Sequence, residues 1–125
     1  PLNFFASKNE MEILFNNLIN NAIKYNKNNG KVIIKGEETD SSIIIKIKDT
    51  GIGIAPDDLS KIFDEFYRSV EAKSRRLSGT GLGLSIVKRM IELYNGTIDV
   101  ASKLNEFTEF TIILPKNTNT NQAIN

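Results

Sequence analysis

Residues 31 to 49, KVIIKGEETDSSIIIKIKD, carry two runs of β-branched side chains separated by a short polar turn. The first run extends from Lys31 to Glu38 and the second from Ser42 to Asp49. Because valine and isoleucine favour the pleated surface of a sheet, the stretch predicts an antiparallel hairpin. The hairpin places a sheet in the fold, and its neighbours in sequence decide what covers that sheet.

A helix is predicted before the hairpin. Ser7 and Glu10 have the spacing of a capping pair, so the helix is expected to begin near Lys8 and to end near Tyr25, before the turn-rich residues 26–30. Its apolar positions recur at helical spacing and form one broad face. They are Leu14, Phe15, Leu18, Ile19 and Ala22.

Two further helices and two strands are predicted after the hairpin. A short helix follows Pro56 and is expected to bury Leu59, Ile62, Phe63 and Phe66. The other helix begins at Leu84, with Val87, Ile91 and Tyr94 on its apolar face, and stops at Asn95-Gly96. The strands extend from Thr97 to Ala101 and from about Phe107 to Leu114, and Pro115 closes the second strand.

This order of elements predicts an α+β fold. Helices and strands do not alternate strictly, which favours a two-layer sandwich with a mixed, mostly antiparallel sheet and helices packed on one face. We expect one domain over residues 1–115, with a partial lead-in strand in residues 1–7. The Asn/Thr-rich tail, residues 116–125, is expected to be disordered.

The composition limits the chemistry. The chain of 125 residues has a net charge of +1, so it offers no overall field for nucleic acid or an anionic membrane. It contains no cysteine, which fits a reducing compartment such as the cytoplasm. It also contains no histidine, and so lacks the commonest general base and metal ligand. No apolar run approaches the roughly 20 residues of a membrane span.

The second half of the first predicted helix carries four asparagines, at positions 16, 17, 20 and 21, and asparagine is a poor helix former. At about 100° per residue, Asn17, Asn21 and Lys24 share one side beside the apolar face. An amide oxygen suits Mg²⁺ and a lysine can neutralise phosphate charge, so these three are candidates for a site. The alternative is a solvated polar face, which we favour for Asn16 and Asn20.

Asp49 ends a strand rich in isoleucine and is followed by Thr50, Gly51, Ile52 and Gly53. A carboxylate there would suit an amine donor such as that of adenine, and the glycines allow close approach of the backbone. Taken alone, the segment is more typical of an ordinary turn at the end of a strand.

A glycine-rich run, SGTGLGL at residues 78–84, opens the third helix. Its spacing fits neither the dinucleotide fingerprint nor the P-loop. Backbone N–H groups at such a helix start favour an anion, and the preceding loop is basic. Arg68 is the candidate in that loop, whereas Lys73, Arg75 and Arg76 fit a solvated charge run and Phe63 and Phe66 fit the core.

Four segments together, Asn17–Tyr25, Asp49–Gly53, Phe63–Arg68 and Gly79–Leu84, resemble the four boxes of the ATP-binding domain of sensor histidine kinases. The wider superfamily, with the Bergerat fold, also includes gyrase, heat-shock chaperone ATPases and mismatch-repair ATPases. The similarity covers about Asn9 to Pro115, although the turn at residues 104–107 lacks the usual Gly-x-Gly.

The resemblance implies ATP and Mg²⁺ as cofactors and assigns a role to each matching residue. Asn21 would coordinate Mg²⁺, with Asn17 beside it. Lys24 and Tyr25 would face the nucleotide, Asp49 would accept the adenine amine, and Gly51 and Gly53 would shape that pocket. Arg68 would reach the phosphates, residues 68–80 would form a lid, and its hinge would be Gly79, Thr80, Gly81, Leu82, Gly83 and Leu84.

The resemblance also implies the partner. Water-splitting members of the superfamily carry a glutamate at the position of Asn17, and an amide cannot accept the proton. We therefore expect ATP to be presented to a histidine on a separate dimerisation domain of a homodimeric parent kinase, which serves a response regulator. The resemblance implies a cytoplasmic chain without direct membrane contact, and it allows an inner-membrane anchor in the parent. The alternatives are a regulatory nucleotide-binding module and an ATP-hydrolysing member.

Overall fold

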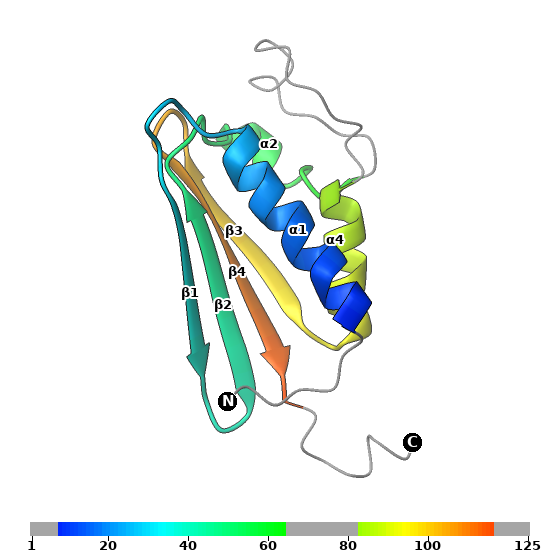
Figure 1. Ribbon diagram of the computed structural model, residues 1–125. Coiled ribbons are helices and arrows are strands. Elements are labelled where there is room, and N and C mark those ends of the chain that lie inside the picture. The colour runs from blue at the N-terminus through cyan, green and yellow to red at the C-terminus, as the bar shows by residue number, and fades with distance from the viewer. Residues whose placement is uncertain (1–7, 65–82, 117–125) are drawn as a thin grey trace.

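The computed structural model describes residues 8–64 and 83–116, which form a sheet with helices on one of its faces (Figure 1). The expected lead-in strand, the lid at residues 68–80 and the tail after Lys116 lie outside the described residues. The elements are α1 (Lys8–Lys24), β1 (Val32–Glu38), β2 (Ser42–Asp49), α2 (Pro56–Leu59), α4 (Gly83–Leu93), β3 (Thr97–Lys103) and β4 (Phe107–Pro115).

The described strands form one sheet in the order β1-β2-β4-β3, and each neighbouring pair is antiparallel. α1 and α4 lie side by side over one face of it (Figure 1). The predicted hairpin is confirmed, with Val32 opposite Asp49 and Glu38 opposite Ile43. The α+β sandwich is therefore confirmed.

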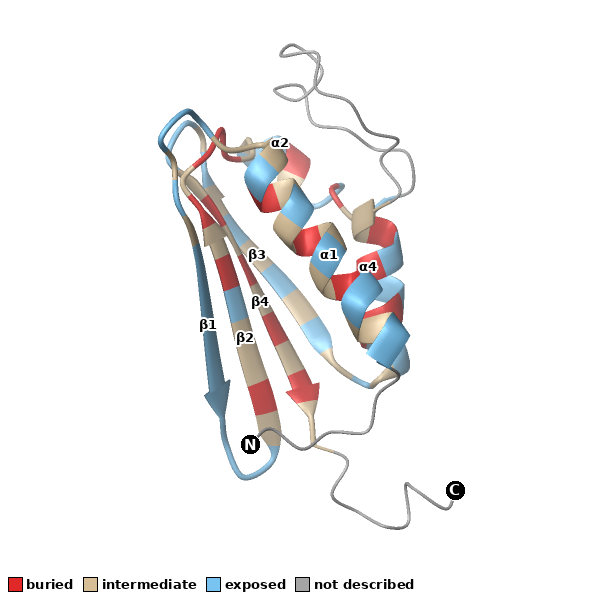
Figure 2. Ribbon diagram, viewed as in Figure 1, coloured by how far each residue is buried: buried red, intermediate tan, exposed pale blue. Residues whose placement is uncertain are grey.

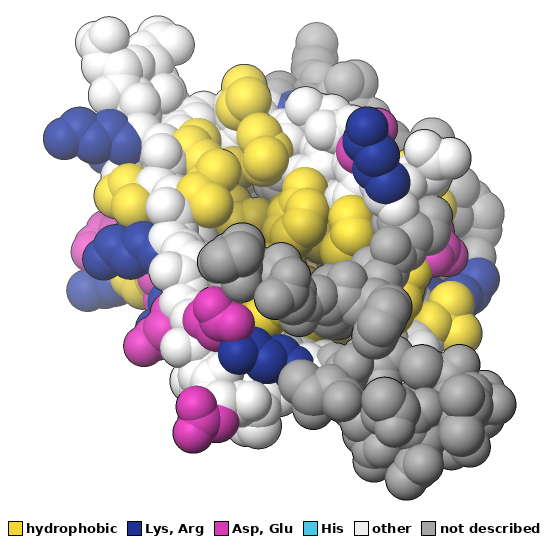
Figure 3. All heavy atoms as spheres, turned by 60° about the horizontal axis from the view of Figure 1, so that its bottom comes forward, with side chains coloured by type: hydrophobic (Ala, Val, Ile, Leu, Met, Phe, Trp, Pro, Cys, Tyr) yellow, Lys and Arg dark blue, Asp and Glu magenta, His cyan; other side chains and the backbone are white. Residues whose placement is uncertain are grey.

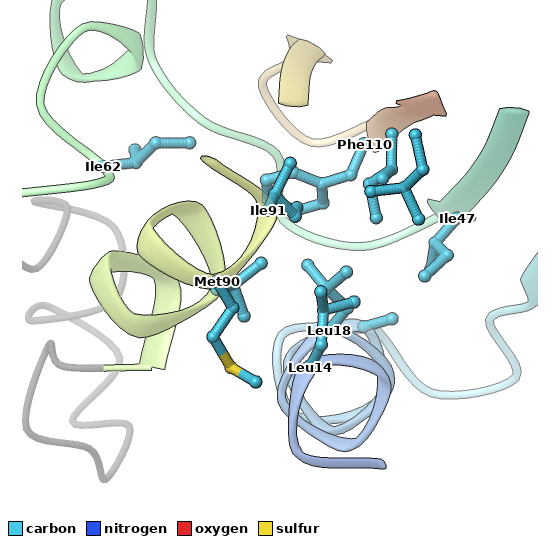
Figure 4. Packing of buried hydrophobic residues seen from close by; sticks show 11 residues of the cluster. Leu14, Leu18, Ile47, Ile62, Met90, Ile91 and Phe110 are labelled. Atoms are coloured by element: carbon cyan, nitrogen blue, oxygen red, sulfur yellow. The ribbon is translucent and has the colours of Figure 1, made fainter. Parts of the chain in front are cut away.

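The core lies between the sheet and the two long helices (Figure 2). Leu14 and Leu18 of α1 and Val87 and Ile91 of α4 are fully buried, and Figure 4 shows several of them meeting Ile47 and Phe110 from the sheet. Burial of a side chain of this size contributes about 1.5–3 kcal/mol. The core therefore fixes how α1 and α4 sit on the sheet.

The inner face of the sheet changes from apolar to polar near the end of β2. One row across β1, β2, β4 and β3 is apolar and consists of Ile34, Ile47, Phe110 and Val100. The row at the end of β2 contains Val32, Asp49, Thr108 and Ser102. Asp49 and Thr108 are both only 6% exposed, so this row buries polar groups that need partners.

The surface at the opposite end of the molecule, the lower end in Figure 1, carries hydrophobic side chains. Figure 3, which brings that end forward, shows hydrophobic side chains gathered there. Large hydrophobic side chains exposed on the described residues as a whole are Ile13, Ile23, Ile33, Ile34, Ile86 and Leu93. Such gathering is typical of surfaces that meet other parts of a protein.

The helix predicted after Pro56 is shorter than expected. α2 ends at Leu59, and the chain continues in turns in which Lys61 donates to the carbonyl of Asp58 and Asp64 to that of Lys61. Ile62 is buried and Phe63 packs against the core, as predicted, while Phe66 lies outside the described residues. Four residues are too few for a self-supporting helix, so packing decides this segment.

Three asparagines of the described residues, Asn29, Asn95 and Asn105, adopt the left-handed conformation in turns. Asn95 has φ 62° at the end of α4, which confirms the predicted stop. Asn105 has φ 63° between β3 and β4, at the turn that lacks the usual glycines. Because asparagine tolerates this region better than most residues, Asn105 lets the hairpin close without glycine.

Candidate functional site

Asp49 is the buried acid at the end of β2. Its Oδ1 accepts a hydrogen bond from the Gly51 N–H at 2.9 Å. Burial raises the pKa of the Asp49 carboxyl to about 6, and the Gly51 hydrogen bond opposes that rise. At neutral pH the group is therefore ionised and can only accept hydrogen bonds.

The loop after Asp49 is held on one side by the end of α1. The Ile52 N–H donates to the Tyr25 carbonyl at 3.0 Å. A Cβ on Gly51 would lie 2.1 Å from the same Tyr25 oxygen, closer than any side chain could come. The absence of a side chain at Gly51 is what lets the loop pack against α1.

The other side of the loop is held by the β3–β4 turn. The Asn105 N–H donates to the Ile52 carbonyl at 2.7 Å. Gly53 has φ 70°, and a Cβ there would lie 2.2 Å from the Lys103 carbonyl oxygen. Both glycines predicted to shape a pocket thus sit where backbone from another element approaches closely.

The α1 candidates lie at different depths. Asn17 and Asn21 are partly buried, whereas Asn16 and Asn20 are exposed as expected for a solvated face. Lys24 is the last residue of α1, and its Nζ lies 5.3 Å from the centre of the Tyr25 ring.

Asn17 meets the start of α4. Its Nδ2 donates to the Ile13 carbonyl at 2.9 Å, and its Oδ1 lies 2.9 Å from where a Cβ on Gly83 would be. The structure therefore brings together two predicted site residues that are far apart in sequence. Leu84, next along α4, packs against the core. Arg68, Gly79, Thr80, Gly81 and Leu82 lie outside the described residues.

Two polar residues of this region were not predicted. Thr108 lies opposite Asp49 on β4, and its Oγ1 is 2.9 Å from the Ser102 Oγ of β3. The available signal was the alternation of β4, in which Thr108 takes an inward position otherwise filled by Phe110, Ile112 and Leu114. A threonine at such a position needs a polar partner, which the sequence does not supply locally.

Comparison with known proteins identifies the family. The sequence model described as histidine kinase-, DNA gyrase B- and HSP90-like ATPase matches residues 6–118. The chain belongs to this ATPase family. It is 47% identical over 106 residues to the sensor protein SrrB of Staphylococcus aureus, covering 85% of this chain and 18% of that protein. The chain thus spans less than a fifth of this relative's length.

Solved structures with the same fold include that of a sensor histidine kinase. A mycobacterial sensor histidine kinase, MprB, superposes with a TM-score of 0.82 at 28% identity, over 90% of this chain and 76% of that one. Full-length ShkA in complex with AMPPNP gives a TM-score of 0.78 at 29% identity, over 93% of this chain and 24% of that one. This chain is therefore homologous to histidine protein kinases and constitutes their ATPase domain.

The described part of the ATPase domain contains neither an acidic cluster suited to a metal ion nor a membrane-spanning helix. Residues 8–64 and 83–116 contain no group of three or more acidic side chains close enough to hold a metal ion. No helix within these ranges is long and apolar enough to cross a membrane.

The glycines allow a test of the packing around the loop. Gly51→Ala should destabilise the domain by about 2 kcal/mol or more, because the new methyl group meets the backbone oxygen of Tyr25. Gly83→Ala should change stability by less than about 1 kcal/mol, since it meets only the end of the Asn17 side chain. Urea unfolding of both variants checks this expectation. Equal losses in the free energy of unfolding would contradict the difference in packing.

The raised pKa of Asp49 predicts a pH-dependent stability. The folded state binds the proton more tightly than a model carboxyl of pKa 3.8, so ionisation costs stability as the pH rises from about 4 to about 6. Asp49→Asn should therefore gain stability relative to the parent chain between pH 4.5 and pH 7.5, measured by unfolding without nucleotide. The exposed Asp99→Asn is the control. A pH-independent difference for Asp49→Asn would contradict the raised pKa.

Proposed function

We propose that this chain is the catalytic, ATP-binding domain of a two-component sensor histidine kinase, which binds Mg-ATP and presents the γ-phosphate to a histidine on a separate dimerisation domain. The observation that carries the proposal is the buried, ionisable Asp49 at the foot of a loop clamped from both sides. Burying a group that can only accept hydrogen bonds costs free energy unless donors meet it, and a bound ligand would supply such a donor.

The adenine end of the proposed site is the polar row of the sheet. Asp49 accepts one hydrogen bond from Gly51 and retains further acceptor capacity for the amine of adenine. Thr108 lies next to it across the β2–β4 pair and adds a second oxygen. Gly51 and Gly53 let the loop beside this row pack against the end of α1 and the end of β3.

The phosphate end of the proposed site lies between α1 and the start of α4. Asn21 would coordinate Mg²⁺ through its amide oxygen, Asn17 would lie beside it, and Lys24 would approach the phosphates. The α4 N-terminus, which meets Asn17, presents the positive end of a helix dipole of 11 residues. Arg68 and residues 79–82 would complete this end.

The amide oxygens of α1 suit a Mg²⁺ ion that a nucleotide also binds. Amide oxygens are hard ligands, and Mg²⁺ keeps several waters and binds phosphates in preference to an all-protein cage. When bound, the ion neutralises charge on the transferring phosphoryl group. Asn21 would hold the ion, with Asn17 beside it, and Lys24 would balance the negative charge of the phosphates.

The same residues favour transfer to a nucleophile outside this chain. Asn17 stands where a water-activating base would be, and its amide cannot accept the proton. The chain contains no histidine to receive the phosphoryl group. We infer that the acceptor histidine lies elsewhere in a homodimeric, inner-membrane or cytoplasmic parent kinase, and that an aspartate of a response regulator later takes the phosphoryl group.

The adenine role predicts a pH-dependent affinity. An amine donor binds the ionised Asp49, so ATP binding should weaken about tenfold between pH 8 and pH 5 beyond the change caused by the phosphates. Asp49→Asn should weaken binding at pH 8 and remove this additional dependence. Calorimetry on the variant and on Asp99→Asn checks both expectations. An Asp49→Asn variant with the affinity of the parent chain would contradict the adenine role.

The transfer reaction has a direct test. Labelled ATP and Mg²⁺ mixed with this chain and the histidine-bearing dimerisation helices of the parent kinase should yield an acid-labile phosphohistidine. Asn21→Ala should reduce its formation at least a hundredfold by removing the proposed metal ligand. Steady phosphate release by this chain alone at about 1 per second or faster would instead identify a hydrolysing ATPase, and binding without either reaction would identify a regulatory module.

A further inference from the structure

The hydroxyl of Ser102 links three separate parts of the chain. It accepts a hydrogen bond from the Ile54 N–H at 2.7 Å, donates to the Phe107 carbonyl at 2.7 Å and lies 2.9 Å from the Thr108 Oγ1. Ile54 belongs to the loop after Asp49, and Phe107 and Thr108 are consecutive residues at the start of β4, so Ser102 joins β3 to both. Ser102 therefore holds the loop after Asp49 in a fixed position relative to β4.

The single proton of a serine hydroxyl decides the direction of these hydrogen bonds. The Phe107 carbonyl can only accept, so the Ser102 proton goes to it, and the Ile54 N–H can only donate. Ser102 must then accept from Thr108, and the Thr108 proton is committed to Ser102. The Thr108 oxygen consequently offers only lone pairs to anything else that approaches it.

We propose that Ser102 is a positioning and specificity-determining residue, which holds Thr108 as an acceptor so that the Asp49–Thr108 pair selects a ligand edge bearing an amino group. The proposal rests on the proposed nucleotide-binding function. Asp49 and Thr108 face the same side of the sheet from opposite positions on β2 and β4, and both are buried. Two adjacent acceptors favour an exocyclic amine and repel a carbonyl oxygen.

Adenine and hypoxanthine nucleotides separate this role from a merely structural one. Adenine carries an amine at position 6, whereas hypoxanthine carries a carbonyl there on a ring of nearly the same shape. Loss of the Ile54 hydrogen bond should loosen the loop and weaken the binding of both nucleotides equally. Release of the Thr108 proton should instead favour hypoxanthine, because a free threonine hydroxyl can donate to a carbonyl.

The experiment measures the dissociation constants of ATP and ITP by calorimetry on the 125-residue chain and its variants. Ser102→Ala should lower the preference for ATP over ITP by about tenfold, the factor expected for one hydrogen bond reversed in direction. Ser102→Thr, which keeps the hydroxyl, should retain the preference. Thr97→Ala is the matched control, since Thr97 lies exposed on the same strand.

A double-mutant cycle tests whether Ser102 acts through Thr108. Thr108→Val should also lower the preference, and adding Ser102→Ala to it should lower the preference no further. If Ser102→Ala fails to fold, as judged by thermal unfolding, Ser102→Cys provides the comparison with a weaker hydrogen-bonding group. An unchanged preference in folded Ser102→Ala, or in Ser102→Cys where Ser102→Ala does not fold, would overturn the proposal while ATP binding by the parent chain still stands. Failure of the parent chain to bind ATP would overturn the nucleotide function itself.

Discussion

The burial of one carboxylate, Asp49, is the constraint on which the arrangement around it depends. An ionised group that is 6% exposed loses hydration, and its raised pKa expresses that cost. One hydrogen bond from Gly51 returns part of the lost interaction. The domain thus keeps a destabilising group at the end of an otherwise apolar strand, which is common where binding rather than stability has shaped a position.

Keeping that carboxylate in place requires a rigid loop, and the rigidity comes from backbone contacts. The loop is pinned to the α1 end through Tyr25 and to the β3–β4 turn through Asn105. Both contacts depend on glycine, because a side chain at Gly51 or Gly53 would collide with a carbonyl oxygen. Since the apolar core fixes α1 and the sheet, it also fixes the two anchors of the loop.

Most of the fold could be predicted from the sequence because its signals are local. The hairpin, the face of α1 and the stop at Asn95 follow from side-chain periodicity and turn preference. The length of α2 could not be predicted, since packing of Ile62 and Phe63 outweighs helix propensity over so short a segment. Asp49 and Gly51 were predictable as a motif, but their partners at Tyr25 and Thr108 are set by sheet register and helix packing.

The residues missed by sequence reasoning share a physical reason. Ser102 and Thr108 are ordinary strand residues in sequence, and only the pairing of β3 with β4 and of β2 with β4 places them beside Asp49. Their chemistry depends on the direction of hydrogen bonds, which no spacing pattern encodes. Because a hydroxyl can donate or accept, its role is fixed by its neighbours. The Phe107 carbonyl makes Ser102 donate its proton, and Ser102 in turn makes Thr108 donate its own proton to the Ser102 oxygen. The acceptor character of the polar row is thus a property of three strands together.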